Sequence, residues 1–417
     1  MTKREYLNAL VAGLIDLSTD ELRRIKAYYE EMIDDRVEEG MTEEDAVAEL
    51  EPPEALAKKL LEENGVAPSR KAGAGQAAKD RFWFGGEIRE LEARIGSIDV
   101  DLRVEALEDG CTAFIVLDGV DAGDIRAELT DGRLYVEELE YLRRNIFRFR
   151  PRRMRILLNR AELEALDYHT ASGDAHIAGL KPAQAAIQTA SGDVELEQLA
   201  CGGELEINAA SGDVKLTDTA VAGKLTMHSA SGDKKLQWVS AACLALASSS
   251  GDSAVETANI GGDIDMGASS GDLTLRTVSF AGECAIQTAS GDVKLANTTG
   301  GGLRLGTKSG DVELLTCGLE AANIDTTSGD VSLQETDIQG ELEVHTISGE
   351  IAFKATSAGC MELKTTSGEV RGTLRGVEAY SFSAQSRTGD VRVPTTDGPH
   401  SIQAETVSGD IHLRVMP

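Results

Sequence analysis

Thirteen carboxylate side chains recur at one position of a repeated triplet, Ser-Gly-Asp or a close variant, from residue 172 onward. The step between them is 19 to 21 residues, and the series runs from Asp174 to Asp410 with glutamate at positions 350 and 369. Carboxylates spaced regularly along a rod could bind calcium. The candidate ligands of such a calcium ladder are Asp193, Asp213, Asp233, Asp252, Asp272, Asp292, Asp311 and Asp330.

The competing interpretation gives these aspartates a structural role in a turn. Neighbouring carboxylates about 4.8 Å apart repel by roughly 1 kcal/mol in water, so something must offset the repulsion. Backbone N–H groups in a glycine-containing turn can do so, because Asp commonly accepts hydrogen bonds from the backbone two residues further along the chain. Calcium-binding solenoids use a nine-residue Gly-Gly-x-Gly-x-Asp repeat, which this sequence lacks. We therefore favour the turn and keep calcium as the alternative.

A basic segment at residues 141–160, YLRRNIFRFRPRRMRILLNR, departs most from the acidic background and contains no acidic residue. It is a candidate site for an anionic partner, such as phospholipid headgroups, a cell-wall polymer or the acidic run between Glu30 and Glu39 of the same chain. An exposed strand face whose arginines pair with acidic neighbours explains it equally. The candidate binding patch consists of Arg143, Arg144, Arg148, Arg150, Arg152, Arg153 and Arg155.

Other reactive residue types form no recognisable catalytic or metal pattern. The six cysteines contain no CxxC pair and no zinc-type spacing to histidine, so we expect no metal and no cofactor. His169 and His176 flank one triplet, but neither has an obvious nucleophile to activate. Few aromatics are available to stack on sugar rings, and no repeat stands out as a catalytic cluster. The sequence predicts a protein that is not an enzyme.

The chain has 417 residues and a formal net charge of -30, which disfavours nucleic acid as a partner. It contains no run of about 18 apolar residues, and Asn8 and Asp16 interrupt the only stretch that could serve as a signal peptide. We therefore expect a cytoplasmic protein, with a cell-surface or membrane-associated location as the alternative.

Residues 1–64 are predicted to form a small bundle of helices. Capping patterns begin at Thr2, Ser18 and Thr42, and apolar residues recur at helical spacing between them. The segment YLNALVAGLIDLSTDELRRIKAYYEEMIDDRVEEGMTEEDAVAEL resembles a helical signalling domain found beside PadR-type regulators. Residues 65–80 are rich in small residues and glycine and are predicted to be a flexible linker.

The repeat predicts a mainly β fold, a parallel β-solenoid of about 12–13 coils, over residues 166–417. Residues 81–165 are expected to be a β-rich entry and cap. Val-x-Leu follows most triplets and alternates with the period of a strand, which turns one face inward. A hydroxyl residue lies two positions before most triplets and shares this inward face. These residues are Thr170, Thr189, Ser229, Thr288, Thr307, Thr326, Thr346, Thr365 and Thr406.

Residues 95–417 resemble the bacterial putative-adhesin family of β-helices, through the repeated Ser-Gly-Asp-Val-x-Leu coils and the segment ILLNRAELEALDYHTASGDAHI. The resemblance implies a non-catalytic binding or scaffold protein whose partner is a protein or an anionic cell-envelope ligand. The alternative is an envelope-stress signalling component, intracellular or close to the membrane, whose helical domain contacts a regulator.

The last triplet is followed by Ile411 to Val415 and then by Pro417, with no separate capping element. An uncovered solenoid end tends to associate with other strands. The sequence therefore predicts self-association through the C-terminal coil.

Overall fold

The computed structural model describes residues 76–78, 80–107, 110–139, 152–376 and 379–416, together with scattered positions between 3 and 59. The chain divides into two compact units, residues 1–160 and 161–417. The strand Glu162–Thr170 spans the predicted boundary at 165/166 and pairs in parallel register with Lys181–Thr189.

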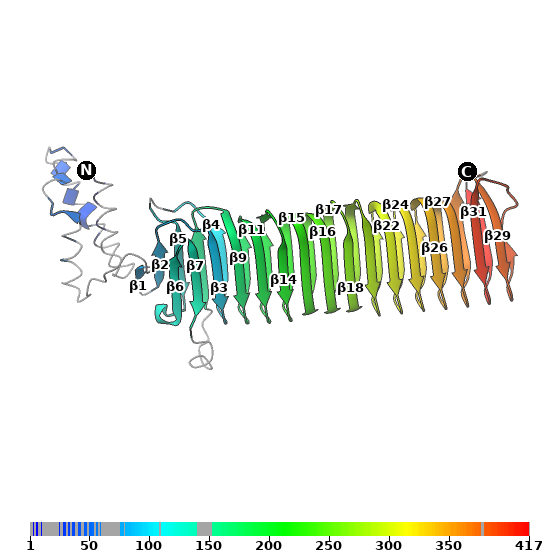
Figure 1. Cartoon of the computed structure of the whole chain (residues 1–417), viewed down its shortest axis with the longest axis horizontal. Helices are drawn as coiled ribbons and strands as arrows, with labels where there is room; N and C mark the ends of the chain where they lie inside the picture. Colours follow the sequence, from blue (N-terminus) through cyan, green and yellow to red (C-terminus); the bar gives the residue numbers. More distant parts are fainter. Residues whose placement is uncertain are drawn as a thin grey trace. The chain divides into compact units, whose positions relative to one another are not determined.

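Residues 161–417 form a parallel β-solenoid with one coil per triplet, as predicted, and their strands stand side by side in Figure 1. The strands are β9 (Glu162–Thr170), β10 (Ala175–Ala178), β11 (Lys181–Thr189), β12 (Val194–Glu197), β13 (Ala200–Cys201), β14 (Leu205–Ala209), β15 (Val214–Ser231), β16 (Lys234–Ser250), β17 (Ser253–Ile260), β18 (Ile264–Ser270), β19 (Leu273–Phe280), β20 (Glu283–Thr288), β21 (Val293–Ala296), β22 (Thr299–Thr307), β23 (Val312–Leu315), β24 (Gly318–Thr326), β25 (Val331–Gln334), β26 (Asp337–Thr346), β27 (Ile351–Thr365), β28 (Val370–Arg375), β29 (Tyr380–Ser386), β30 (Val391–Arg392), β31 (His400–Thr406) and β32 (Ile411–Met416).

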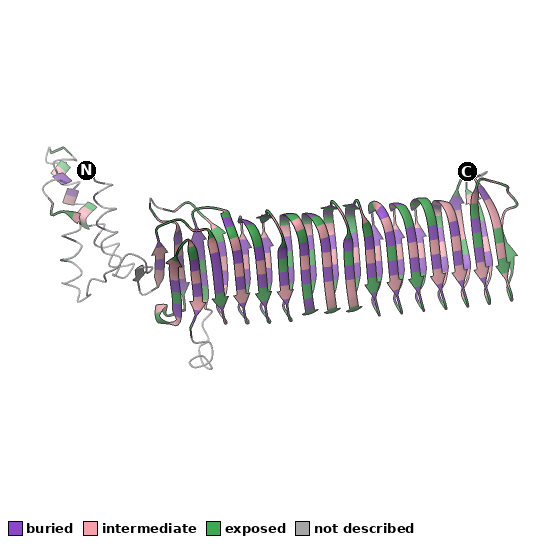
Figure 2. Ribbon diagram, in the orientation of Figure 1, coloured by how far each residue is buried: buried purple, intermediate pink, exposed green. Residues whose placement is uncertain are grey.

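Equivalent residues of successive coils pair in parallel register, so they form columns along the solenoid. Val194 pairs with Val214, and Leu196 pairs with Leu216. The inward members of these columns are buried: Leu196, Leu216 and Leu236 are each 0% exposed. Figure 2 shows the resulting alternation of buried and more exposed residues along the strands. Each coil therefore buries its apolar face against the neighbouring coils, as the alternation of apolar and polar residues in the sequence predicted.

The column of hydroxyl residues before the triplets points inward, and all nine predicted members are buried. Thr189 Oγ1 donates to the carbonyl oxygen of Gly192 at 2.8 Å and accepts from its N–H at 3.0 Å. The glycine of the triplet is needed because the coils approach closely here: a Cβ on Gly192 would lie 2.0 Å from the carbonyl oxygen of Gly173. The hydroxyl and the glycine together make the turn at this corner.

A second corner lies five residues after each marker carboxylate, where the backbone is left-handed in ten successive coils. The first of these residues is glycine, Gly179, at φ 74°. The other nine carry side chains, which is uncommon for this backbone region, and three of them are β-branched threonines. They are Gln198, Asp218, Trp238, Thr257, Thr277, Asn297, Thr316, Glu335 and Ala355.

The cysteines of the solenoid follow the inward and outward pattern. Cys201, Cys284 and Cys317 are buried, whereas Cys243 and Cys360 are half-buried, and all are free thiols. Burial raises the pKa of Cys284 to about 12, so its thiol stays neutral at physiological pH. The three buried cysteines therefore behave as small hydrophobic residues of the core.

The last two coils do not stack in chain order. β31 pairs with β27 on one side and with β29 on the other, and β32 likewise lies between β28 and β30. In Figure 1 the red β31 accordingly stands inside the orange β29. The prediction that the C-terminal coil is the uncovered end is therefore wrong. β31 and β32 are inserted between earlier strands, and the preceding coil, residues 379–392, lies outermost among the described residues.

The β part of residues 1–160 contains two groups of paired strands. β1, β2, β5, β8 and β4 pair in that order, and β7 pairs with both β6 and β3. The elements are β1 (Gln76–Ala78), β2 (Arg81–Phe84), β3 (Glu90–Ile95), β4 (Asp99–Val104), β5 (Ala113–Asp118), η1 (Ala122–Asp124), β6 (Ile125–Thr130), β7 (Arg133–Glu138) and β8 (Arg153–Leu158).

The predicted linker overlaps this sheet at its end. Gln76 pairs with Trp83 and Ala78 pairs with Arg81, so residues 76–78 belong to a strand. The apolar alternation of β2 provides a partner for this short segment, which has no strand pattern of its own. Residues 65–75 of the predicted linker lie outside the described residues.

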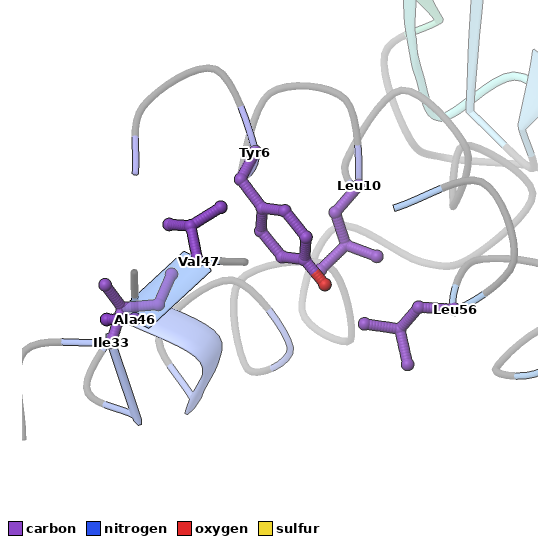
Figure 3. Packing of buried hydrophobic residues seen from close by; sticks show 6 residues of the cluster. All are labelled: Tyr6, Leu10, Ile33, Ala46, Val47 and Leu56. Carbon is purple, nitrogen blue, oxygen red and sulfur yellow. The ribbon is translucent and has the colours of Figure 1, made fainter. Parts of the chain in front are cut away.

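Several described positions among the first 59 residues are helical and share a buried cluster, which Figure 3 shows. The Tyr6 hydroxyl donates to the carbonyl oxygen of Glu51 at 2.7 Å, and burial raises the pKa of Tyr6 to about 12. Among the described residues, no helix combines the length and the apolar composition needed to cross a bilayer. The cluster consists of Tyr6, Leu10, Ile33, Ala46, Val47 and Leu56.

Candidate functional site

The marker carboxylates form a column of backbone acceptors. The N–H of Asp213 donates to Asp193 Oδ1 at 2.9 Å, and the N–H of Asp233 donates to Asp213 Oδ1 at 2.8 Å. The same bond recurs for all eight candidate calcium ligands, from Asp193 to Asp330. One oxygen of each carboxylate thus links two coils. The donor is the marker residue of the next coil, 19 or 20 residues further along the chain, and not the backbone two residues on that the turn interpretation expected. Calcium binding along the column stays a prediction.

The arginine-rich segment divides into residues with different surroundings. Arg143, Arg144, Arg148 and Arg150 lie outside the described residues. Arg153 and Arg155 are exposed on β8, in register with Asp99 and Asp101 of β4. Their role in binding an anionic ligand stays a prediction.

Arg152 does not belong to an exposed patch. Its side chain is only 11% exposed, and Nη1 donates to Glu138 Oε1 at 2.6 Å and to Ser97 Oγ at 2.8 Å. Glu138 lies at the end of β7, distant in sequence, so the spacing of arginines alone could not reveal this partner. The Arg152 guanidinium forms its ion pair with the buried Glu138 carboxylate. Arg152 is therefore not part of an exposed binding patch.

The acidic run proposed as an internal docking surface is described only at Glu30, which lies 3.6 Å from Lys3 Nζ. Glu31, Asp34, Asp35, Glu38 and Glu39 lie outside the described residues. Docking of the helical region onto the arginines stays a prediction.

A groove on the solenoid surface was not anticipated from the sequence. Its lining includes one column of hydrogen-bonding side chains, His169, Gln188, Asn208 and His228, which we call the imidazole–amide column. These residues come from four consecutive coils and pair in register across β9, β11, β14 and β15. Each immediately precedes an inward residue, which turns its own side chain outward.

Two features shape this groove. His169 Nε2 lies 2.7 Å from Asp167 Oδ1, and Asn208 Nδ2 donates to Glu206 Oε1 at 2.8 Å, so acidic neighbours hold both side chains in place. Beside the imidazole–amide column runs a column of small side chains, Ala190, Ala210 and Ala230. The surface therefore offers a row of hydrogen-bonding groups next to a row of small apolar alanine side chains. A sequence signal existed, namely alanine recurring three residues before the marker carboxylate.

The outermost coil provides a second exposed feature. Within the part of the chain that the structure describes, β29 pairs with β31 alone and β30 pairs with β32 alone. Val391 is 41% exposed there, but Arg387, Asp390 and Arg392 are also exposed. Charged side chains on an edge strand discourage indiscriminate pairing. The sequence predicted self-association through the C-terminal coil, whereas in the structure β29 and β30, and not β32, form the outer edge.

Solved structures that resemble the chain share little sequence with it. A putative adhesin from Parabacteroides distasonis is 15% identical, with 72% of this chain and 98% of that protein covered and a TM-score of 0.26. A putative adhesin from Bacteroides fragilis is 14% identical, with 83% and 98% covered and a TM-score of 0.19. A putative lipid binding protein from P. distasonis is 13% identical, with 82% and 99% covered and a TM-score of 0.21.

Family models give the remaining comparison. Among curated proteins, no relative matches the chain. A HAAS model matches residues 5–59, within the predicted helical region. The Toastrack DUF4097 model matches residues 125–283 and 262–414, which together make up more than half of the chain. The chain therefore belongs to the Toastrack DUF4097 family.

Proposed function

We propose that the solenoid is a non-catalytic binding scaffold whose groove holds an extended, uncharged polar polymer such as a glycan chain. The observation that carries this proposal is the imidazole–amide column, in which four consecutive coils present hydrogen-bonding side chains in register. Parallel coils repeat about every 4.8 Å, so the column suits a ligand built of repeating units better than a single reacting centre.

The chemistry of the groove also selects the ligand class. Gln188 and Asn208 each offer both donors and acceptors, as hydroxyl-rich chains require. Alanine side chains beside them allow a ligand backbone to approach the strands closely. A strongly anionic polymer is disfavoured because the chain carries a net charge of -30 and Asp167 and Glu206 lie beside the column.

Binding of the full-length chain to a panel of soluble neutral oligosaccharides tests the proposal. We expect at least one oligosaccharide of several units to bind, and the Gln188→Ala/Asn208→Ala variant to lose most of the affinity. Gln287→Ala is the matched control, because Gln287 lies in register with His228, through Ala247 and Gly267 of the intervening coils, but does not line the groove. Absence of binding, or equal binding by the double variant, would contradict the proposal.

A second candidate function concerns the helical region, because residues 5–59 match the HAAS model. Tyr28 is 59% exposed and Met41 is 38% exposed in this region, which makes them candidate contacts for a regulatory protein. Cross-linking of the full-length chain in its native cells should then capture a DNA-binding regulator. The Tyr28→Ser/Met41→Ser variant should lose this partner, whereas Gln188→Ala/Asn208→Ala should retain it. Capture that is unchanged in Tyr28→Ser/Met41→Ser would reject this second function.

A further inference from the structure

Three metal-ligating side chains converge on the outer face of two neighbouring coils. They are His176 on β10 and Glu195 and Glu197 on β12, and one potential ligand atom from each lies within 4.8 Å of the other two. His176 Nε2 is 3.4 Å from Glu197 Oε2. All three side chains are half-buried and therefore reachable from solvent.

The parallel register of the solenoid creates this arrangement. His176 pairs directly with Glu195, while Glu197 pairs with Ala178, two residues further along the same face. The inward neighbours Ile177 and Leu196 are each 0% exposed, so the core anchors the strands that carry the ligands. The separation between ligands is thus set by strand spacing and not by a mobile loop.

We propose that His176, Glu195 and Glu197 bind one divalent transition-metal ion, with zinc as the representative. An imidazole nitrogen and two carboxylate oxygens are a ligand set that zinc accepts at about 2.0–2.2 Å. Two ligands of a tetrahedral ion at those bond lengths are about 3.3 Å apart, which the His176–Glu197 pair already satisfies. A small rotation of Glu195 completes the set and leaves one position for water or a ligand atom.

Lys215 on the next coil is the natural competitor for this ion. Its Nζ lies 2.5 Å from Glu195 Oε1, in the column that continues from His176 through Glu195. A metal ion must share Glu195 with this ammonium group or displace it. Removal of the ammonium should therefore strengthen metal binding, an effect opposite to that of removing a ligand.

Other histidines of the solenoid lie beside carboxylates without forming such a set. His345 Nδ1 is 3.4 Å from Asp325 Oδ1, close to the separation of His176 from Glu197. Among the described residues, however, only the group of His176, Glu195 and Glu197 brings three potential ligands together. His345 is therefore a matched control for an imidazole–carboxylate pair that lacks the third ligand.

The test is calorimetric titration of the chelator-treated full-length chain with Zn²⁺, together with the visible absorption spectrum of its Co²⁺ complex. We expect one specific ion per chain. His176→Ala and Glu197→Gln should each weaken binding by about tenfold or more, because one of three ligands is lost. His345→Ala should leave binding unchanged, and Lys215→Met should tighten it, whereas Lys235→Met on the following coil should not.

Circular dichroism of each variant verifies that the solenoid is intact, which is expected because all the substituted side chains face outward. No specific Zn²⁺ binding would overturn the proposal. Binding that survives both His176→Ala and Glu197→Gln would place the ion elsewhere and would overturn it equally. Neither result depends on the imidazole–amide column, so the glycan-binding proposal is tested separately.

Discussion

The guanidinium of Arg152 and the carboxylate of Glu138 form a buried ion pair, with Nη1 2.6 Å from Oε1. The Glu138 side chain is 0% exposed, and its Oε2 also accepts from the N–H groups of Gly96 and Ser97 at 2.7 and 2.9 Å. Four protein groups thus converge on one carboxylate, because Ser97 Oγ lies within reach of Oε1 as well. The pair thus links the end of β7 and the start of β8 to Gly96 and Ser97 in the turn after β3.

Removal of Arg152 should destabilise the first unit strongly. Arg152→Met leaves a buried carboxylate without its cation, and we expect a loss of about 3–5 kcal/mol in the free energy of unfolding. The double variant Arg152→Met/Glu138→Gln should recover part of that loss. Chemical denaturation measures both effects, and Arg153→Met is the control, since an exposed arginine should change stability by less than about 0.5 kcal/mol. Equal effects of Arg152→Met and Arg153→Met would contradict the buried pair.

The marker aspartates should matter as hydrogen-bond acceptors more than as charges. Asp272 Oδ1 accepts from the N–H of Asp292 at 2.9 Å. Asp272→Ala removes this acceptor and should cost about 1 kcal/mol, whereas Asp272→Asn keeps an acceptor oxygen and relieves repulsion within the column. Thermal unfolding with and without Ca²⁺ measures both roles. A calcium ladder requires that Ca²⁺ raise the melting temperature and that Asp272→Asn reduce this rise.

Lys234 is a buried amine at a position where neighbouring coils carry Val214 and Ser253. It is 1% exposed, and its Nζ has no hydrogen-bond partner among the described residues. Burial lowers the pKa of Lys234 from 10.5 to about 8, against the opposing effect of the Asp233 charge. Replacement by an apolar side chain, Lys234→Met, should therefore stabilise the solenoid by about 3 kcal/mol near pH 7.

The pH dependence follows from that depressed pKa. Between pH about 8 and 10.5 the unfolded chain binds more protons at Lys234 than the folded chain does, so stability increases with pH across this window. Below pH 8 the full cost of burial is present. The advantage of Lys234→Met should therefore shrink as pH rises toward 10.5, and a constant advantage would show that Lys234 is not buried as a titrating amine. Lys235→Met, at an exposed position, is the control.

The left-handed corner offers a stabilising substitution. Thr277 adopts φ 56°, a conformation that is costly for a β-branched residue and much easier for asparagine. Thr277→Asn should raise the free energy of unfolding by about 1 kcal/mol. Thr274→Asn should lower stability, because Thr274 pairs in register with Ala254 and Lys294 and asparagine is a poor strand former. Destabilisation by both changes would argue against a strained corner at Thr277.

Cross-linking can establish the order of the last coils. Cys360 pairs in register with Ser401 of β31, whereas Ser381 of β29 pairs with the other side of β31. Adjacent strands lie about 4.8 Å apart, within the range that a disulfide can bridge, and two strand spacings exceed it. Oxidised Ser401→Cys should therefore form a disulfide with Cys360, and Ser381→Cys should not. Mass spectrometry after proteolysis distinguishes the two, and the reverse result would mean that the coils stack in chain order.

Much of the solenoid could be predicted because its information is local and repeated. The step of 19 to 21 residues, the Val-x-Leu alternation and the hydroxyl column define one coil, its inward face and its turn. The buried threonines from Thr170 to Thr406 confirm this inference. The candidate sites were harder to predict from the sequence. A ligand set such as His176 with Glu197 forms only when separate coils lie in a particular register.

The sequence by itself determined that this chain is a solenoid, because each repeat carries an apolar face that only a neighbouring repeat can cover. It did not determine which repeats are neighbours at the end: every coil offers the same edge, so β31 can lie against β27 even though β29 comes first in the chain. Only the tertiary structure decided that order. The burial of Arg152 against Glu138 was likewise decided in three dimensions, because an ion pair depends on distance in space, which spacing along the chain does not encode.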